Sequence, residues 1–323
     1  MIGIRDVASY LPATTLSSAE LTEKFGFKPG FLENKVGVET RHVSAPGEST
    51  SEMCVKAFER LRARHPNTDF SDVGLLLLCT QNPDYKLPHT SSVVQHRLGL
   101  PQSLLAFDIS LGCSGFVATL VTAKALMTEL GLRRGLVFTC DPYTKVLADD
   151  DKNTRALFGD AASATLLEEG APLRIEKSTF GNDGSMFETL IVRGSGTAKA
   201  EGETESPLSM DGRNIFNMLK RQVPVSIREC AEINRLSLAE IDLFLFHQAS
   251  AWLLQVLCQD LGLERERVPC NIRSVGNTVS TSIPLLLEDV LHCSHPLPTR
   301  IMMSGFGVGL AWASVVVRSD DPA

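Results

Sequence analysis

The sequence lacks the features that mark several large classes of protein. No stretch approaches the roughly 18 to 20 continuous apolar residues of a membrane span, and the first residues do not have the pattern of a signal peptide. The 38 Asp and Glu residues outnumber the 31 Lys and Arg residues, so the net charge of −7 lacks the basic excess typical of nucleic-acid binding. The eight cysteines form no CxxC pair and no metal-ligand spacing with histidine. We therefore expect a cytoplasmic protein with no metal site, no nucleic-acid partner and no membrane contact.

The composition is that of an ordinary globular protein. The chain has 323 residues, of which 43% are hydrophobic and 21% are charged, enough for one large domain or two medium ones. Short apolar runs alternate with segments of helical period. The pattern predicts strands at 74–79, 104–109 and 135–139, and helices at 52–64, 91–98 and 114–129. Such alternation, with nearly continuous apolar strands, predicts an α/β fold whose sheet is covered on both faces.

The two halves of the chain resemble each other. "DVGLLLLCTQ" and a helix ending in "HRLGLP" match "EIDLFLFHQA" and a helix ending in "QDLGLE". "FGDAASATLLEEG" likewise resembles "GFGVGLAWASVVVRSD" at the end of the chain. We predict a duplication, with one half at residues 1–170 and the other at 171–323, because "EEGAPLR" supplies a charged turn with Gly and Pro. The polar stretch "RGSGTAKAEGETESPLS" is expected to form a surface loop.

Cys113, in "DISLGCSGF", is a candidate nucleophile. It follows a predicted strand and precedes a predicted helix, so we expect its thiol in the first helical turn, where the helix dipole and unpaired N–H groups favour the thiolate. Gly112 and Gly115 would let backbone and substrate approach closely. The alternative is an inert core cysteine, since free cysteines are commonly buried.

Two further candidates lie at similar junctions. His247 ends the apolar strand "LFLF", and Asn277 follows a glycine before another predicted helix. Ligands gather at the carboxyl ends of strands in open α/β sheets, which favours a shared site for these residues and Cys113. The alternatives are a hydrogen-bonded histidine at a strand end and an asparagine that caps a helix. The late "MSGFGVGLAWAS" is not a GxGxxG fingerprint, and its turn could supply part of an oxyanion hole or simply connect two strands.

Taken together, "DISLGCSGF", "LFHQAS", "VGNTVSTSIP" and "SGFGVGLAWAS", in this order, resemble the β-ketoacyl-acyl-carrier-protein synthase III family of the thiolase superfamily. The resemblance extends over almost the whole chain, through "VASYLP", "KVGVETRHV", "FGDAASA" and "MDGRNIF". It implies a thiolase-type layered αβαβα fold made of two duplicated halves, the first carrying the cysteine and the second the histidine and asparagine. It also implies a homodimer.

The resemblance implies a decarboxylative condensation. Cys113 would accept an acyl group from acyl-CoA, and a malonyl thioester, on CoA or on an acyl-carrier protein, would then bind. His247 and Asn277 would stabilise the enolate oxygen formed on loss of CO2, and the backbone N–H groups of Cys113 and Gly307 would bind the later oxyanion. No cofactor is implied. The product would enter fatty-acid synthesis or the synthesis of polyketides or other secondary metabolites.

The resemblance also assigns substrate contacts. Phe31 stands where the family often has a tryptophan that stacks on adenine, and Lys35 and Lys152 stand where it often has arginines for the nucleotide. Leu87 corresponds to a phenylalanine that a partner subunit places at the floor of the primer pocket, so a smaller residue suggests a longer primer. Phe306, in the closing turn, is expected to line the same site.

The chain departs from the family where an acidic carrier protein would dock. Family members typically read HQAN with an arginine two residues later, whereas this chain has Ser250 and Trp252. Asn217, Gln259 and Asp260 stand at other positions that are often basic. Lost positive charge weakens attraction to an acidic partner, which favours malonyl-CoA or an unusual carrier as the extender.

Other functions fit part of the same sequence pattern. Ala161 and Ser163 replace glycines in the family's "FGDGAGA" motif, which suggests a specialised member. An acyltransferase on the same fold would move the acyl group to a hydroxyl or amine without condensation, and a small type III polyketide synthase would share the Cys, His and Asn order. A degradative thiolase would need a second cysteine before the last glycine turn, and "MMSGFGVG" has none.

Overall fold

The computed structural model describes residues 1–293 and 296–319. Within these residues, nine strands form one mixed sheet in the order β11-β12-β13-β8-β1-β7-β6-β4-β5. Their bounds are β1 (Ile2–Tyr10), β4 (Val73–Cys79), β5 (Leu105–Ile109), β6 (Arg134–Cys140), β7 (Ala162–Glu169), β8 (Leu173–Asn182), β11 (Leu243–Phe246), β12 (Arg300–Gly307) and β13 (Ala311–Ser319).

The sheet consists of two half-sheets of the same design. In one, β4 and β6 are parallel, and β7 and β1 follow antiparallel. In the other, β11 and β12 are parallel, and β13 and β8 follow antiparallel. The halves join through only two residue pairs between β1 and β8, and β5 extends the first half. The predicted duplication is therefore present in the topology. The boundary near residue 170, which falls between β7 and β8, stays a prediction.

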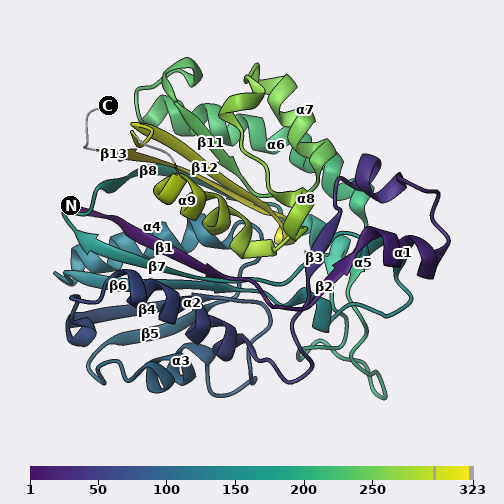
Figure 1. Ribbon diagram of the computed structural model, residues 1–323, viewed down its shortest axis with the longest axis horizontal. Helices are drawn as coiled ribbons and strands as arrows, with labels where there is room; N and C mark the ends of the chain where they lie inside the picture. Colours follow the sequence, from purple (N-terminus) through teal and green to yellow (C-terminus); the bar gives the residue numbers. More distant parts are fainter. Residues whose placement is uncertain (294–295, 320–323) are drawn as a thin grey trace.

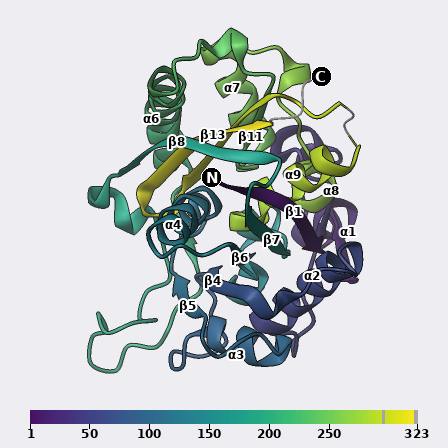
Figure 2. The same ribbon diagram turned by 90° about the vertical axis from the view of Figure 1, so that its left-hand side faces the viewer.

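Helices form three layers around these half-sheets (Figures 1 and 2). Helices α2 (Thr50–Arg64) and α3 (Thr90–Leu98) cover the outer face of the first half-sheet, and α6 (Gly212–Ile233) and α7 (Ala251–Leu261) cover the outer face of the second. Helices α4 (Gly115–Glu129) and α9 (Ser282–Cys293) contact both half-sheets and lie between them. The five layers confirm the predicted αβαβα fold.

The apolar sequence of β4 follows from the helices that cover both faces of its half-sheet. Leu75 and Leu77 pack into the central core beside α4, whereas Leu76 and Leu78 pack into the outer core beneath α2. Alternate residues of a strand point to opposite faces, so a strand covered on both faces must be apolar throughout. The predicted strands and helices all occur, with ends within two residues of those expected.

Shorter elements gather at one end of the molecule, on the right in Figure 1: α1 (Ser18–Phe25), α5 (Lys152–Arg155), α8 (Ile272–Val275), β2 (Thr15–Ser17) and β3 (Thr40–His42). The chain also has helical turns at Leu32–Val36, Tyr143–Lys145, Val279–Thr281 and Val308–Leu310. Between β9 (Leu190–Ile191) and β10 (Ser209–Met210), the predicted surface loop projects from the body. In the part of the chain that is described, no helix has the length and hydropathy needed to cross a membrane.

Candidate active site

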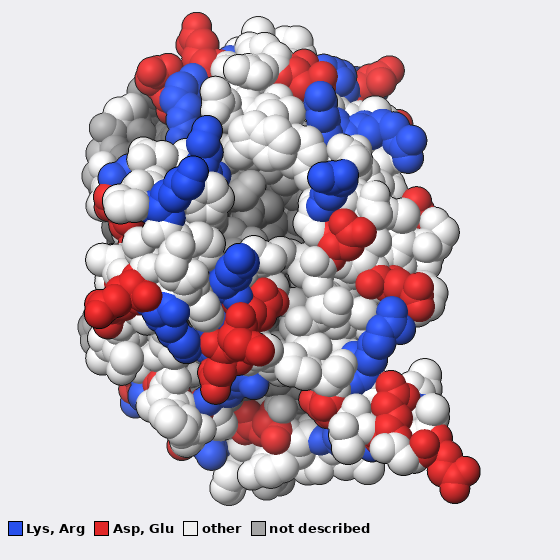
Figure 3. Space-filling view, turned by 90° about the vertical axis from the view of Figure 1, so that its right-hand side faces the viewer, with Lys and Arg blue, Asp and Glu red and all other residues white. Residues whose placement is uncertain are grey.

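One cavity of about 370 Å³ brings together most of the residues singled out in the sequence. Both halves of the chain contribute to its wall, which includes Phe31, Lys35, Cys113, Lys152, Phe158, Phe216, His247, Trp252, Asn277, Phe306 and Gly307. Figure 3 looks onto this end of the molecule, where the surface is hollowed and Lys and Arg side chains lie around the hollow. Leu87 is not part of this wall. It is 87% exposed on the loop before α3, so its expected role in a partner's pocket stays a prediction.

Cys113 lies in the turn just before α4, which begins at Gly115, and not in the first helical turn as predicted. Its side chain is 5% exposed, and burial raises the pKa of the thiol to about 12. The backbone N–H of Val308 lowers this pKa, but by less than burial raises it. The nearby N–H groups favour the thiolate, as expected, but loss of water around the sulfur outweighs their effect on the pKa of the resting thiol.

The glycines around Cys113 make room for protein atoms. A Cβ on Gly112 would lie 2.4 Å from Oε1 of Gln81, and one on Gly115 would lie 2.1 Å from Sγ of Cys79. These two glycines thus let the turn pack against residues at the end of β4, in line with the expected close approach of the backbone. Close approach of substrate at these glycines stays a prediction. Gly307 is different, because a Cβ there would lie 2.6 Å from Sγ of Cys113 itself.

His247 is held at the end of β11 by its neighbours. Its backbone N–H donates to the carbonyl of Ser304 on β12, and its Nδ1 lies 2.7 Å from the hydroxyl of Ser282 on α9. The ring edge packs against Phe306, with the centroids 5.6 Å apart. Burial lowers the pKa of His247 to about 3, so the imidazole is neutral at physiological pH. With Nδ1 occupied by Ser282, Nε2 remains available to a ligand in the cavity.

Asn277 presents its amide nitrogen. Its Oδ1 accepts a hydrogen bond of 2.9 Å from the N–H of Val279, whereas Nδ2 makes only a long contact of 3.4 Å to the carbonyl of Ala249. Its backbone pairs with the segment around Phe158, which fixes the side chain's position. Because α9 begins five residues later, at Ser282, Asn277 does not cap that helix. The side chain can therefore donate a hydrogen bond into the cavity.

Aromatic and basic side chains form the outer part of the cavity. Phe31 is partly exposed and stacks on Phe27, with ring centroids 5.7 Å apart and planes 7° apart. On another part of the wall, Phe216 and Trp252 stack with centroids 3.9 Å apart. Lys35 and Lys152 also line the cavity, as the resemblance implied.

Sequence reasoning missed some residues of the site. Phe216 was not predicted as part of the wall, although it ends the quoted motif "MDGRNIF". Ser282 was not predicted as a partner of His247, although it lies in the quoted "VGNTVSTSIP". Val308, which approaches the thiol, also lies inside a quoted motif, "SGFGVGLAWAS". The motifs identified the segments that form the site, but the spacing of residues within them did not predict which side chains are in contact.

Comparison with known proteins gives consistent matches. The sequence model for 3-oxoacyl-[acyl-carrier-protein (ACP)] synthase III matches residues 107–184, and the model for the C-terminal part of the same enzyme matches residues 231–319. The chain is 33% identical to the β-ketoacyl-[acyl-carrier-protein] synthase III of Lactococcus lactis subsp. lactis (strain IL1403), over 98% of both chains.

Solved structures agree with the sequence matches. A 3-oxoacyl-(acyl-carrier protein) synthase from Burkholderia xenovorans LB400 has a TM-score of 0.89 and 32% identity, over 98% of this chain and 94% of that one. The priming β-ketosynthase from the R1128 polyketide biosynthetic pathway has a TM-score of 0.90 and 27% identity, over 100% of this chain and 97% of that one. These relatives favour a condensing enzyme over a plain acyltransferase or a type III polyketide synthase. The chain therefore belongs to the 3-oxoacyl-[acyl-carrier-protein] synthase III family of condensing enzymes.

Proposed function

We propose that this chain condenses an acyl group carried on Cys113 with a malonyl thioester and releases CO2. The observation that carries the proposal is the meeting of one thiol, one imidazole and one side-chain amide in a single cavity. Cys113 comes from the turn before α4, His247 from the end of β11, and Asn277 from the segment before α9. No cofactor is needed, because loss of CO2 itself supplies the electron pair for the new carbon–carbon bond.

The first step loads the acyl group. The sulfur of Cys113 attacks the carbonyl of acyl-CoA, the bond to the CoA sulfur breaks, and the thiol proton leaves with CoA as its thiol. A resting thiol fits this scheme, since the proton has a final acceptor in the departing thiolate. The N–H of Val308 faces the sulfur and favours its negative charge as the proton leaves.

The second step generates the carbon nucleophile. When the malonyl thioester loses CO2, the electron pair moves onto the thioester oxygen, where Nε2–H of His247 and Nδ2–H of Asn277 donate hydrogen bonds. The Ser282 hydroxyl lies 2.7 Å from Nδ1 of His247 and 3.0 Å from the carbonyl of Val279, which can also accept its single proton. The proposed role of His247 requires that proton to be donated to Nδ1, which makes Ser282 a positioning residue. Loss of one such donor typically costs about 100- to 1,000-fold in rate.

In the third step, the enolate carbon attacks the acyl carbonyl on Cys113. The tetrahedral oxyanion is bound by the backbone N–H groups of Cys113 and Gly307. Its collapse breaks the bond to sulfur and releases the β-ketoacyl product, and the Cys113 thiolate then takes a proton from solvent to restore the thiol. Phe306, packed on the ring of His247, completes the wall at this point. Two N–H groups aimed at one position are the usual way to stabilise such a charge.

The outer cavity is proposed to bind coenzyme A. Phe31 offers a partly exposed ring on which adenine can stack, and Lys35 and Lys152 offer positive charge for the phosphates. Lysine is a point charge without the two-pronged geometry of arginine, so we expect weaker binding of CoA than an arginine pair would give.

We further propose malonyl-CoA as the preferred extender. Trp252 is 55% exposed and stacks on Phe216, so an aromatic surface occupies a position where a basic one would attract an acidic carrier. Asp260 adds negative charge nearby on α7 and pairs with Arg228. Turnover with malonyl-CoA should exceed turnover with a malonyl-acyl-carrier protein, and Trp252→Arg should narrow the difference. A clear preference of the unchanged enzyme for the carrier protein would contradict this proposal.

The chain is also proposed to form a homodimer through β5. Among residues 1–293 and 296–319, this strand lies at the edge of the sheet and pairs with β4 alone, and Leu105 on it is exposed. Free strand edges with apolar side chains are prone to pair with another copy. Sedimentation should give a dimer, and Leu105→Lys should weaken it. A monomer at micromolar concentration would contradict the proposal.

We propose a cytoplasmic location, which the free state of the eight cysteines supports. The product is proposed to enter fatty-acid or polyketide synthesis.

One experiment tests the proposed reaction. The protein is incubated with acyl-CoA and then with malonyl-CoA, and its intact mass and released CO2 are measured. The proposal predicts an acyl adduct that is absent in Cys113→Ala, and CO2 release that depends on this adduct. Acyl transfer to a hydroxyl or amine without CO2 release would favour the alternative acyltransferase.

A further inference from the structure

A second cavity lies near Cys113, although Cys113 is not part of its wall. It has a volume of about 850 Å³, and its wall includes Gln81, Asn82, Tyr143, Leu190 and Val308. Leu190 lines both cavities, and the N–H of Val308 faces the thiol. Cys113, Tyr143 and Leu190 belong to one packed cluster. Since CoA occupies the first cavity in the proposed function, the second cavity is the candidate site for the acyl group on Cys113.

The part of this cavity next to Cys113 is polar. Tyr143 is almost fully buried, and its hydroxyl donates a hydrogen bond of 2.6 Å to Oε1 of Gln81. The Gln81 backbone is fixed in turn, because its N–H donates to the buried carboxyl of Asp141 at 2.7 Å. The Gln81 side chain packs directly on Gly112, the residue before Cys113, as the clash of an added Cβ indicates. The amide of Gln81 therefore lies close to the nucleophile.

Two polar atoms of this wall have no protein partner. Among the described residues, Nε2 of Gln81 donates to no acceptor, although Oε1 of the same amide is used. Oδ1 of Asn82 is buried and accepts no hydrogen bond. Because Oδ1 of Asn82 has almost no accessible surface, Nε2 of Gln81 is the one of the two atoms that a ligand can reach. An alkyl chain packed against Nε2 would keep water from it without replacing the hydrogen bond, which is costly, whereas a hydroxyl oxygen can accept from this N–H.

We propose that the primer acyl group carries a hydroxyl within a few bonds of its thioester carbon, and that Gln81 and Tyr143 select it. This inference rests on the proposed function. Gln81 supplies the donor, and Tyr143 holds the amide in the orientation that turns Nε2 toward the cavity. Sites built to bind a substrate hydroxyl discriminate strongly against analogues that lack it.

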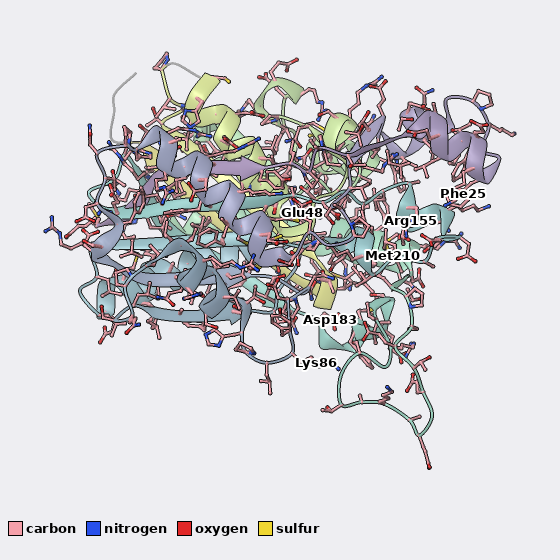
Figure 4. All side chains as sticks on the ribbon, turned by 60° about the horizontal axis from the view of Figure 1, so that its bottom comes forward. Phe25, Glu48, Lys86, Arg155, Asp183 and Met210 are labelled. Carbon is pink, nitrogen blue, oxygen red and sulfur yellow. The ribbon has the colours of Figure 1, made fainter. Side chains whose placement is uncertain are left out.

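A matched pair of substrates tests the inference. Butyryl-CoA and 3-hydroxybutyryl-CoA, the latter as both enantiomers, differ only in the hydroxyl, and intact mass gives the rate at which each acylates Cys113. We expect one hydroxylated enantiomer to react at least about tenfold faster than butyryl-CoA. Gln81→Leu should reverse this preference, and Tyr143→Phe should reduce it. Lys199→Ala is the control and should leave the ratio unchanged, because Lys199 is exposed on the projecting loop and lines neither cavity. Lys86, near the base of that loop in Figure 4, is unsuitable because it is part of the cavity wall.

The outcomes separate the two proposals. Equal or faster acylation by butyryl-CoA would overturn the hydroxyl preference while leaving the condensing function in place. An unchanged ratio in both Gln81→Leu and Tyr143→Phe, with adduct still formed, would overturn the assignment to these residues. Absence of any adduct on Cys113 with every thioester would overturn the proposed function, and this inference with it.

Discussion

Replacement of Gly307 by alanine should disable the nucleophile while leaving the fold in place. The new Cβ would lie 2.6 Å from Sγ and 2.6 Å from Cβ of Cys113, where ordinary contacts are 3.4–4 Å. The overlap is therefore about 1 Å and can be relieved only by moving the thiol or the end of β12. Overpacking of this kind typically costs about 1–3 kcal/mol of stability. A shift of about 1 Å at a reacting atom can cost about 100-fold in rate.

The assay is rapid-quench acylation by acyl-CoA, followed by intact mass, with urea unfolding measured in parallel. We expect Gly307→Ala to acylate about 100-fold more slowly and to lose about 1–3 kcal/mol of unfolding free energy. Gly196→Ala is the matched control, since a Cβ there meets no atom within 4 Å. If Gly307→Ala forms the adduct within twofold of the unchanged enzyme, the placement of Cys113 against β12 is wrong.

Three further predictions concern charge. Burial raises the pKa of Asp141 from 3.8 to about 6, so the folded state binds this proton more tightly than the unfolded state, and stability falls as pH rises from 3.8 through 6. The unchanged protein should therefore lose unfolding free energy between pH 4 and pH 7.5, by on the order of 3 kcal/mol at about 1.36 kcal/mol per pKa unit, and Asp141→Asn should lack this loss; the same pH dependence in both proteins in urea unfolding would contradict this. Burial lowers the pKa of His247 to about 3, so the rate of decarboxylation should not fall with a midpoint near pH 6.5 when the pH is lowered from 8 to 5. A midpoint near 6.5 that is absent from His247→Gln would refute a neutral imidazole. Lys152→Ala should raise KM for acyl-CoA several-fold at low salt and less at high salt, because Lys152 is expected to face the phosphates of CoA. An equal rise in KM for an acyl-N-acetylcysteamine, which has no phosphates, would show that Lys152 does not bind them.

The fold was predictable because its strongest signals are local. The run at 74–79 is apolar throughout, and only a strand covered on both faces uses such a run in an α/β protein. The duplication was visible because each half places an apolar strand and a helix in the same order. The joining of the halves through β1 and β8 was not predictable, since it depends on two residue pairs about 170 positions apart.

The reactive residues of the site were predictable from the sequence, whereas their protonation states and packing contacts were less so. Cys113, His247 and Asn277 could be chosen because each follows a strand, and their order resembled a known family. The protonation state of the Cys113 thiol could not be predicted from the sequence, because its burial depends on β12 and on the turn at Val308, which lie about 190 residues away. The need for glycine at position 112 could not be predicted in full either, because it comes from the close approach of the Gln81 side chain, about 30 residues away in the sequence.

The outer surface shows the limit of reasoning from charge alone. The sequence indicated that Trp252 removes positive charge from a docking position. It could not indicate that Phe216, on a different helix, would stack on the same ring. Leu87 marks a second limit, because a single chain holds it on an exposed loop and only a partner subunit could bring it to a pocket.

The central claim is that Cys113 carries the acyl group through a decarboxylative condensation. The most direct measurement is a single turnover, in which isolated acyl-enzyme is mixed with labelled malonyl-CoA and both CO2 and the protein mass are followed in time. The account predicts that one CO2 appears for each acyl group that leaves Cys113, and that Asn277→Ala keeps the adduct but slows CO2 release by about 100- to 1,000-fold. CO2 release that leaves the adduct intact, or loss of the adduct without CO2, would contradict the account.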